Sequence, residues 1–452
     1  MSCDRSGRAP AARHAWFVRF LSVSASALAC STASAPVRAQ SEARIEIRSG
    51  ALFKIPAHIE DFQYDGVSPI RFSTGESPEE VLVSDLTKAD FFAITRGGAP
   101  VGNPPVSLPP PQGTRAIVSA TIRIRDGRTT LAGNLRDATT GNRIFANEYP
   151  MGGPPDRRSM HVFADEIVLY LTGEQGVAQT RIAFVRNWGR SRELAVIDYD
   201  GSNERQLYHP MTIVLSPAWA PGGDRIAFTS FGEGEAAVVG LNLQSGKTWR
   251  ISPRTGMSSS PRWSPDGKAI AYGRSTDGNT EICVGDPNGG AVTQLTFNPG
   301  IDTAPCFSPD GSRITFTSDR SGTPQVYVMD RDGSNVVRIT FVGKESDSPD
   351  WSPKGDLIAF VCMFDDVYDI CTMHPDGSDP NRLTAGEGAN ENPRWAPDGR
   401  HLVYSNLRGG DRHICIMAVD GSGKRVLTGG KGDQYNPAWS PSAVREPEQG
   451  SP

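Results

Sequence analysis

Apolar positions recur every 44 residues through the C-terminal two-thirds of the chain. One position of the repeat is always aromatic, at Trp219, Trp263, Phe307, Trp351, Trp395 and Trp439. Three further apolar columns keep the same spacing and start at Ile182, Leu194 and Leu207. Four apolar columns per unit predict four short strands per unit, and four-stranded units of this length are typical of a β-propeller.

The two ends of the repeat predict how the ring closes. The first column starts at Ile182, but a step of 44 residues back from Trp219 reaches Gln175, where there is no aromatic motif. The missing copy lies at the other end of the repeat, around Trp439. We therefore predict six blades, in which the C-terminal segment supplies the innermost strand of the blade that begins at Arg181 and no sheet edge stays open.

The repeated turns and aromatics have a structural explanation. Ser-Pro-Asp-Gly at 264–267 and 308–311 suits a tight turn, and Asp-Gly at 332–333, 376–377 and 420–421 marks a second turn. A ring of Trp side chains could stack on a ligand. A buried aromatic between blades is the expected role, because Trp buries a large area.

Residues ahead of the repeat combine helix and strand patterns, which predicts an α+β N-terminal domain. One helix is expected to start at Pro78, and a second to span 158–171 and end at Gly173. Strands are expected at 44–48, 91–94, 116–124, 129–136 and 143–149. The predicted organisation is a signal peptide at 1–39, an α/β domain at 40–172, a linker at 173–180, the propeller at 181–441 and a tail at 442–452.

The N-terminus has the order of features that is typical of a secretory signal. Arginines precede a short apolar stretch at 20–29, and Val37-Arg38-Ala39 fits a signal-peptidase site. A lipoprotein signal is an alternative, since Cys30 directly follows Ala27-Leu28-Ala29. A disordered N-terminal tail is the other.

Composition narrows the class of protein. The 452 residues include 48 Gly and 35 Pro, which favours many short elements and turns over long helices. A net charge of −5 gives no basic excess for nucleic acid, and no run of 18 apolar residues could form a membrane-spanning helix. Cleavage at the predicted site would leave five cysteines, at 283, 306, 362, 371 and 415. We expect these cysteines to be buried strand residues, and the sequence does not determine which of them form disulfide bonds. Cys362 and Cys371 could face each other across a hairpin.

The usual signatures of catalytic, metal and cofactor sites are absent from the sequence. Its seven His form no HxH or HExxH pair, there is no GxSxG elbow, and no glycine-rich phosphate loop follows a predicted strand. Acidic residues at 319, 330 and 332, and at 365, 366 and 369, could hold a cation, but turn-forming Asp is the expected role. We expect no cofactor, no metal and no enzymatic activity.

Six loops precede the predicted innermost strands and must converge around one axis. They span 210–215, 254–259, 299–303, 343–347, 386–391 and 430–435. Their residues vary between units while the flanking columns persist, which is typical of a binding surface on a constant frame.

Four stretches of the sequence resemble one known family. They are 40–47 (QSEARIEI), 84–92 (SDLTKADFF), the domain junction at 165–185 and the W-S-P-D-G repeats. Over essentially the whole mature chain, the sequence resembles the TolB family of periplasmic proteins of the Tol-Pal envelope system. The resemblance implies a periplasmic, monomeric protein that is not an enzyme and that supports outer-membrane integrity and cell division.

The resemblance also implies two partners. The lipoprotein Pal would bind the propeller mouth, at Met257, Ser258, Ser260, Thr303, Asp347 and Glu391. TolA would bind the mature N-terminus by strand addition, at Gln40, Ser41, Glu42, Ala43, Arg44, Ile45, Glu46 and Ile47. Other outer-membrane proteins stay open as further partners.

Two other functions fit the same sequence. One is a propeller lyase or hydrolase that acts on envelope glycans, which would need clustered His or paired carboxylates facing the axis. The other is a structural module that binds several envelope proteins without Pal.

Overall fold

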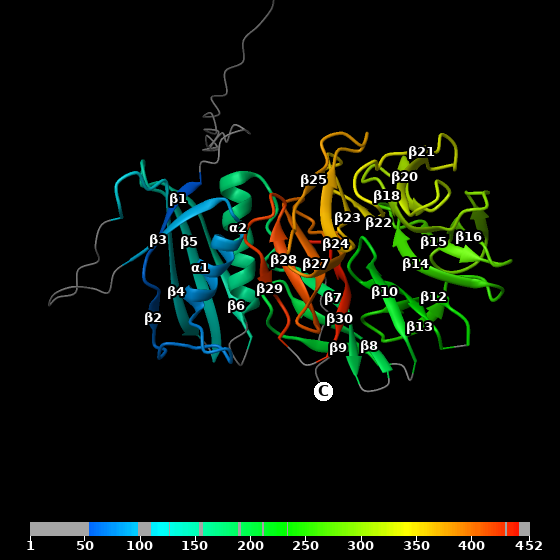
Figure 1. Ribbon diagram of the computed structural model, residues 1–452. Coiled ribbons are helices and arrows are strands. Elements are labelled where there is room, and N and C mark those ends of the chain that lie inside the picture. The colour runs from blue at the N-terminus through cyan, green and yellow to red at the C-terminus, as the bar shows by residue number, and fades with distance from the viewer. Residues whose placement is uncertain are drawn as a thin grey trace, which may run out of the picture. The chain divides into compact units, whose positions relative to one another are not determined.

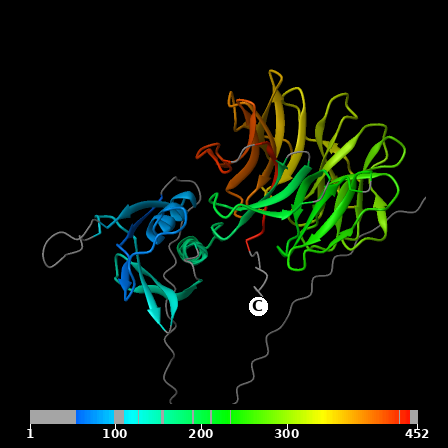
Figure 2. The same ribbon diagram turned by 90° about the horizontal axis from the view of Figure 1, so that it is seen from below.

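The protein combines one mixed sheet and two helices with six four-stranded antiparallel sheets (Figures 1 and 2). The structure is a computed structural model that describes residues 54–97, 110–125, 127–152, 157–188, 191–209, 212–232, 234–429 and 432–442. The predicted signal peptide, the predicted strand at 44–48 and all but the first residue of the predicted tail lie outside these ranges.

The N-terminal sheet has the strand order β3-β1-β4-β5-β6, with β2 beside β4. Its strands are β1 (Ile55–Ile59), β2 (Gln63–Asp65), β3 (Phe92–Arg96), β4 (Ala116–Arg125), β5 (Arg128–Asp137) and β6 (Arg143–Met151). The pairs of β1 with β3 and β4, and of β2 with β4, are parallel, whereas β4, β5 and β6 are antiparallel.

Two helices share a buried core with this sheet: α1 (Pro78–Lys88) and α2 (Arg158–Thr172). Ser77 and Glu80 form a capping box at the start of α1, and Gly173 ends α2 with a φ of 75°. Gly133 of β5 lets α2 approach closely, because a Cβ there would lie 2.6 Å from the ring of Phe163. Both predicted helices are thus present where the sequence placed them.

Strands β1 and β2 were not predicted from the sequence. Strand β1 is the parallel strand between β3 and β4, and Ile55, Ala57 and Ile59 are buried. Its sequence IPAHI carries a Pro and a His, which interrupt the pattern of a strand. His58 is nonetheless buried and its Nδ1 lies 3.0 Å from Thr95 Oγ1 of β3.

The remaining strands form the six blades of a propeller. The first blade has the order β30 (Gln434–Trp439), β7 (Arg181–Trp188), β8 (Ser191–Asp198), β9 (Arg205–Tyr208). The second blade has β10 (Val214–Trp219), β11 (Arg225–Ser230), β12 (Ala237–Asn242) and β13 (Thr248–Arg250). The third blade has β14 (Met257–Trp263), β15 (Ile270–Ser275), β16 (Thr280–Gly285) and β17 (Val292–Gln294).

The last three blades continue in the same way. The fourth blade has β18 (Asp302–Phe307), β19 (Arg313–Ser318), β20 (Gln325–Asp330) and β21 (Val337–Arg338). The fifth blade has β22 (Ser346–Trp351), β23 (Ile358–Phe364), β24 (Val367–Met373) and β25 (Asn381–Arg382). The sixth blade has β26 (Ala389–Trp395), β27 (His401–Arg408), β28 (Asp411–Ala418) and β29 (Arg425–Val426).

The ring closes as predicted, within the first blade. Strand β30 pairs with β7, with Trp439 opposite Ile182. Trp439 Nε1 donates to Thr180 Oγ1 at 2.7 Å, and the backbone N–H of Ser440 donates to the carbonyl of Arg181 at 2.8 Å. The six aromatics of the repeat are between 5% and 9% exposed, so they pack between blades rather than form a ligand platform.

Every innermost strand carries the same kink. The residue before its proline has a positive φ, between 50° and 57°, and the pairing register shifts there, at Ser216, Ser260, Ala304, Ser348, Asn392 and Asn436. Such a bulge re-aims the side chains that follow it. Here it sets the direction of the residue that precedes each repeated aromatic.

The propeller therefore has two different faces. We call the face where the innermost strands begin the mouth face, and the opposite face, which carries the Pro-Asp-Gly and Asp-Gly turns, the turn face.

In the fifth blade, the disulfide bond Cys362–Cys371 joins β23 to β24. Cys283, Cys306 and Cys415 are buried and free.

Candidate protein-binding surface

Exposed apolar side chains gather on the mouth face of the propeller. They come from the ends of strands and the loops of the second to fifth blades, and we call them the mouth patch: Ile213, Phe231, Met257, Phe297, Ile301, Phe341 and Val367. Phe297 and Phe341 are the most exposed, at 77% and 73%. Large apolar side chains grouped on one face of a protein are typical of a docking surface for another protein.

The first and sixth blades present charged groups on the same face. Glu391 and Arg412 of the sixth blade form an ion pair, and so do Glu193 and Arg186 of the first blade. The exposed apolar side chains of the mouth face thus lie on the second to fifth blades, where charged pairs such as Lys344 and Asp366 stand among them.

The predicted Pal-contact residues lie within the innermost strands rather than in the loops before them. Met257, Ser258 and Ser260 belong to β14, Thr303 to β18, Asp347 to β22 and Glu391 to β26. These strands begin earlier than the sequence suggested, because the kink before each proline lets two or three further residues pair with the next strand.

The same residues differ in how accessible they are. Met257 is 53% exposed and belongs to the mouth patch, whereas Ser258 is 1% exposed and offers no surface to a partner, which corrects its predicted role. Ser260 is the kinked residue of β14, and its backbone N–H donates to Thr229 Oγ1 at 3.1 Å. Thr303 and Glu391 are half-buried, as is Asp347, which accepts a hydrogen bond of 2.7 Å from Thr317 Oγ1.

Phe297 and Phe341 were not predicted as site residues. The corresponding positions of the other four units hold His209, Pro253, Ala385 and Gly429. A large apolar aromatic at a loop position where no other unit has an apolar aromatic side chain was the available signal. The predicted TolA-contact residues, Gln40 to Ile47, lie outside the described residues.

The N-terminal domain contacts the turn face through a buried charged cluster. His161 of α2 lies between two carboxylates, with Nδ1 2.7 Å from Asp85 Oδ2 and Nε2 3.6 Å from Asp200 Oδ2. Asp85 belongs to α1, and Asp200 to the turn between β8 and β9. Tyr199 donates to Asp85 Oδ1 at 2.5 Å, and Arg157 Nη2 donates to Asp200 Oδ2 at 2.5 Å.

The charged groups of this cluster shift one another's pKa values. Burial lowers the pKa of His161, but Asp85 and Asp200 outweigh it, so that the pKa is raised above 6.5. Burial raises the pKa of Asp200, but the positive charges of His161 and Arg157 bring it down to about 2. The cluster therefore joins the two domains through ionised groups on the face opposite the mouth.

An ion pair and a cation–π contact also join the propeller to the N-terminal part of the chain. Lys354, in the turn between β22 and β23, lies 2.9 Å from Glu174. Arg400, in the turn between β26 and β27, stacks on the ring of Phe91 at 4.0 Å. These contacts lie on the turn face, so a partner that binds the mouth face would not touch them.

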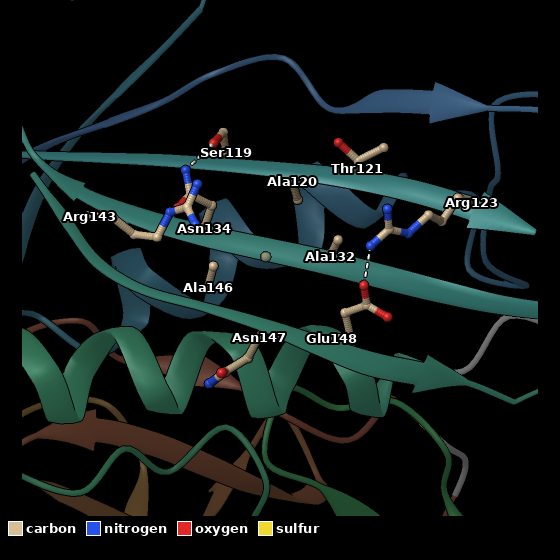
Figure 3. A pocket seen from close by; sticks show the side chains of 11 residues that line it. Ser119, Ala120, Thr121, Arg123, Ala132, Asn134, Arg143, Ala146, Asn147 and Glu148 are labelled. Atoms are coloured by element: carbon tan, nitrogen blue, oxygen red, sulfur yellow. Dashed lines mark hydrogen bonds and ion pairs between the residues drawn. The ribbon is translucent and has the colours of Figure 1, made fainter. Parts of the chain in front are cut away.

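The face of the N-terminal sheet that the helices leave open has a hollow of about 320 Å³ (Figure 3). Arg123 of β4 and Glu148 of β6 form an ion pair across it, and Asn134 Nδ2 donates to Ser119 Oγ at 3.2 Å. Ala132 and Ala146 form its floor. The hollow is shallow and polar, and two of its charged groups, Arg123 and Glu148, are already paired.

The acidic groups with a possible cation role form turns and ion pairs instead. Asp332 accepts hydrogen bonds from Ser334, Asp366 pairs with Lys344 at 2.7 Å, and Asp369 pairs with Arg382 at 2.5 Å. Across the described ranges, no three His, Cys, Asp or Glu side chains are grouped so that they could hold a metal ion. Neither described helix is long and apolar enough to cross a bilayer.

The ring of six blades and the α+β domain ahead of it define a two-domain β-propeller protein, with an exposed apolar patch on its mouth face. The family described as "TolB beta propeller domain" matches residues 169–443, which is more than half of the chain. The chain belongs to this family.

Individual relatives match parts of the chain. It is 33% identical over 189 residues to the "Tol-Pal system protein TolB" of Gluconobacter oxydans (strain 621H), which covers 41% of this chain and 42% of the relative. It is 31% identical over 205 residues to the protein of the same name from Bordetella avium (strain 197N), which covers 44% of this chain and 45% of the relative. The chain thus matches less than half the length of these relatives.

One solved structure matches both domains. The crystal structure of TolB from Acinetobacter baumannii superposes with a TM-score of 0.74 and 26% sequence identity, over 86% of this chain and 97% of that chain. A match of this extent reaches beyond the propeller and includes the N-terminal domain.

Proposed function

We propose that this protein is a periplasmic binding component of the Tol-Pal system that acts without catalysis. Its propeller mouth would hold the lipoprotein Pal, and its segment 40–47 would hold TolA by strand addition. The names of the relatives, which are Tol-Pal system proteins, support the system. In this role the protein would support outer-membrane integrity and cell division.

The mouth patch carries the proposal. Exposed Phe297 and Phe341 rise from loops between blades that are themselves rigidly packed, so docking would need little ordering of the surface. Aromatic side chains of this kind supply a large share of the energy at protein interfaces. Met257, Ser260, Thr303, Asp347 and Glu391 lie at or beside this face, as candidate contacts of the same partner.

The position of the N-terminal domain supports two separable sites. Its contacts with the propeller lie on the turn face, at Asp200, Lys354 and Arg400. A partner at the mouth would therefore leave the contacts between the N-terminal domain and the propeller in place.

Binding of purified Pal by matched variants tests the mouth site. We expect Phe297→Ser and Phe341→Ser each to weaken binding by about tenfold or more, since exposed aromatic anchors dominate such interfaces. The control is Val426→Ser, because Val426 is 60% exposed on β29, outside the mouth patch. Full Pal binding by both Phe variants would contradict the proposed mouth site.

Deletion of residues 40–47 tests the TolA site. We expect the shortened protein to lose TolA capture and to keep Pal capture with an unchanged affinity. Loss of both activities would contradict two separable sites. Turnover of an envelope glycan that disappears when the acidic residues of the mouth are replaced would support the lyase or hydrolase alternative instead.

A further inference from the structure

A second ring of equivalent positions lies deeper in the propeller than the mouth patch. These positions immediately precede the repeated aromatics and follow the kink of each innermost strand. In blade order from the second blade, they hold Ala218, Arg262, Cys306, Asp350, Arg394 and Ala438. Three of the six side chains are charged, and the other three are small.

The charged side chains meet at the propeller axis. Arg262 Nε of the third blade lies 3.8 Å from Asp350 Oδ1 of the fifth blade, so this pair passes over the intervening fourth blade. Asp350 Oδ2 accepts the backbone N–H of Trp395, the neighbour of Arg394 in the sixth blade, at 2.8 Å. The side chains of Arg262 and Asp350 are each 13% exposed, so solvent reaches them.

Positive charge exceeds negative charge in this ring. Two guanidinium groups, of Arg262 and Arg394, face the single carboxylate of Asp350. Burial raises the pKa of the Cys306 thiol to about 12, so this side chain adds no negative charge at neutral pH. The next acid toward the mouth, Asp347, already accepts hydrogen bonds from Thr317 Oγ1 and the backbone N–H of Ser348.

Arg394 is poorly satisfied by the protein. Its Nη1 donates to the carbonyl of Pro393 at 2.5 Å, and its buried Nε has no hydrogen-bond partner among the described residues. Burial and the positive charge of Arg262 lower the pKa of Arg394 to about 10, so it stays charged at neutral pH. Asp350 is shared between Arg394 and Arg262, so one positive charge and the buried N–H at Nε of Arg394 are left uncompensated, and an anion is the usual way to satisfy such a group.

We propose that Arg262 and Arg394 form a binding site for a small inorganic oxyanion, such as phosphate, on the propeller axis. Guanidinium groups suit an oxyanion because each offers several N–H donors in one plane. The small side chains of Ala218, Cys306 and Ala438 leave the other half of the ring uncovered by bulky groups. Asp350 holds Arg262 in place and limits the affinity by its own negative charge. This site lies below the mouth patch and does not depend on the proposed partners.

Isothermal titration calorimetry with sodium phosphate tests the site in the full-length protein. The buffer contains no other oxyanion, and the ionic strength is held constant. We expect saturable binding of one phosphate per chain, and binding about tenfold to a hundredfold weaker in Arg394→Gln and in Arg262→Gln. The control is Arg128→Gln, since Arg128 is an exposed arginine at the start of β5 and its loss should leave the affinity unchanged.

Asp350→Asn gives a test in the opposite direction. The amide oxygen can still accept the N–H of Trp395, while the competing charge is gone, so phosphate should bind more tightly than in the wild type. Absence of saturable phosphate binding by the wild type would overturn the proposal, as would wild-type affinity in both Arg variants or weaker binding in Asp350→Asn. If one Arg variant fails to fold by circular dichroism, the other and Asp350→Asn decide the outcome.

Discussion

Replacement of His161 should weaken the contact between the two domains, and the effect should depend on pH. Its side chain is 4% exposed and those of Asp85 and Asp200 are 1% exposed, so all three groups are removed from water. His161→Gln removes a positive charge that lies 2.7 Å from one carboxylate and 3.6 Å from the other. Breaking a buried ion pair from one side costs about 3–5 kcal/mol.

We expect a loss at the lower end, about 3 kcal/mol, because both carboxylates keep another partner. Asp85 keeps the hydroxyl of Tyr199, and Asp200 keeps the guanidinium of Arg157. A charge-assisted hydrogen bond alone contributes about 1.5–3 kcal/mol, and the second carboxylate adds to it.

The sign of the pH dependence follows from the raised pKa of His161. Its stabilising charge is fully present below the ordinary value of about 6.5 and is lost as the pH rises through the raised value. The titratable groups packed around His161 and its two carboxylates are Asp85 and Lys88 of α1, Arg157 ahead of α2, Asp165 of α2, Asp198, Tyr199 and Asp200 at the end of β8 and its turn, and Arg425 of β29. Burial raises the pKa of Asp165 to about 6, but this carboxyl is present in both the wild type and His161→Gln, so the difference between the two proteins reports His161.

Urea unfolding of the wild type and His161→Gln between pH 5.5 and 9 provides the measurement. The difference in free energy of unfolding should be largest at low pH and should shrink as the wild-type His161 loses its proton. His374→Gln serves as the control, because His374 is exposed at the turn face. Its replacement should change neither the free energy of unfolding nor the pH dependence of that free energy. Hydrogen exchange in α1 and α2 should report the same loss locally. An equal pH dependence in wild type and His161→Gln, or a difference that grows with pH, would refute the reasoning.

Three further predictions concern the propeller. Removal of residues 434–452 takes β30 from the first blade and exposes the edge of β7, so the melting temperature should fall sharply; an unchanged value would count against closure by this strand. Trp439→Ala keeps the strand but leaves a cavity and frees Thr180, and should lower the free energy of unfolding by about 3–5 kcal/mol in a urea titration, whereas a loss below 1 kcal/mol would mean that the site collapses around the gap. Cys362→Ser with Cys371→Ser opens a loop of 9 positions and should lower stability by about 2–3 kcal/mol; dithiothreitol should destabilise the wild type but not this variant, and equal sensitivity would contradict the assigned bond.

The sequence predicted the elements that depend on local or repeated patterns. The 44-residue period located all six blades, because every blade packs against its neighbours through the same apolar columns. It also showed that the innermost strand of the first blade comes from the C-terminal segment around Trp439. The helix that starts at Pro78 was equally accessible, since its capping box lies within four residues.

Features that depend on distant partners were not predictable in this way. Strand β1 is a strand because β3 and β4 flank it, which outweighs the weak strand propensity of IPAHI. His161 and Asp85 are 76 positions apart, and no local pattern indicates that they meet Asp200. The charge at the axis has the same origin, because Arg262 and Asp350 stand in equivalent columns of blades that are not neighbours.

The start and the end of the propeller are hydrogen-bonded to each other although 259 positions separate Arg181 from Ser440. A growing polypeptide therefore cannot finish its first blade until its last strand has been made. Until then the edge of β7 is unpaired and can pair with a strand of another chain, which favours misassembly and slow folding. We expect that the docking of this last strand, more than the stability of any single blade, decides how much of this protein reaches its finished form.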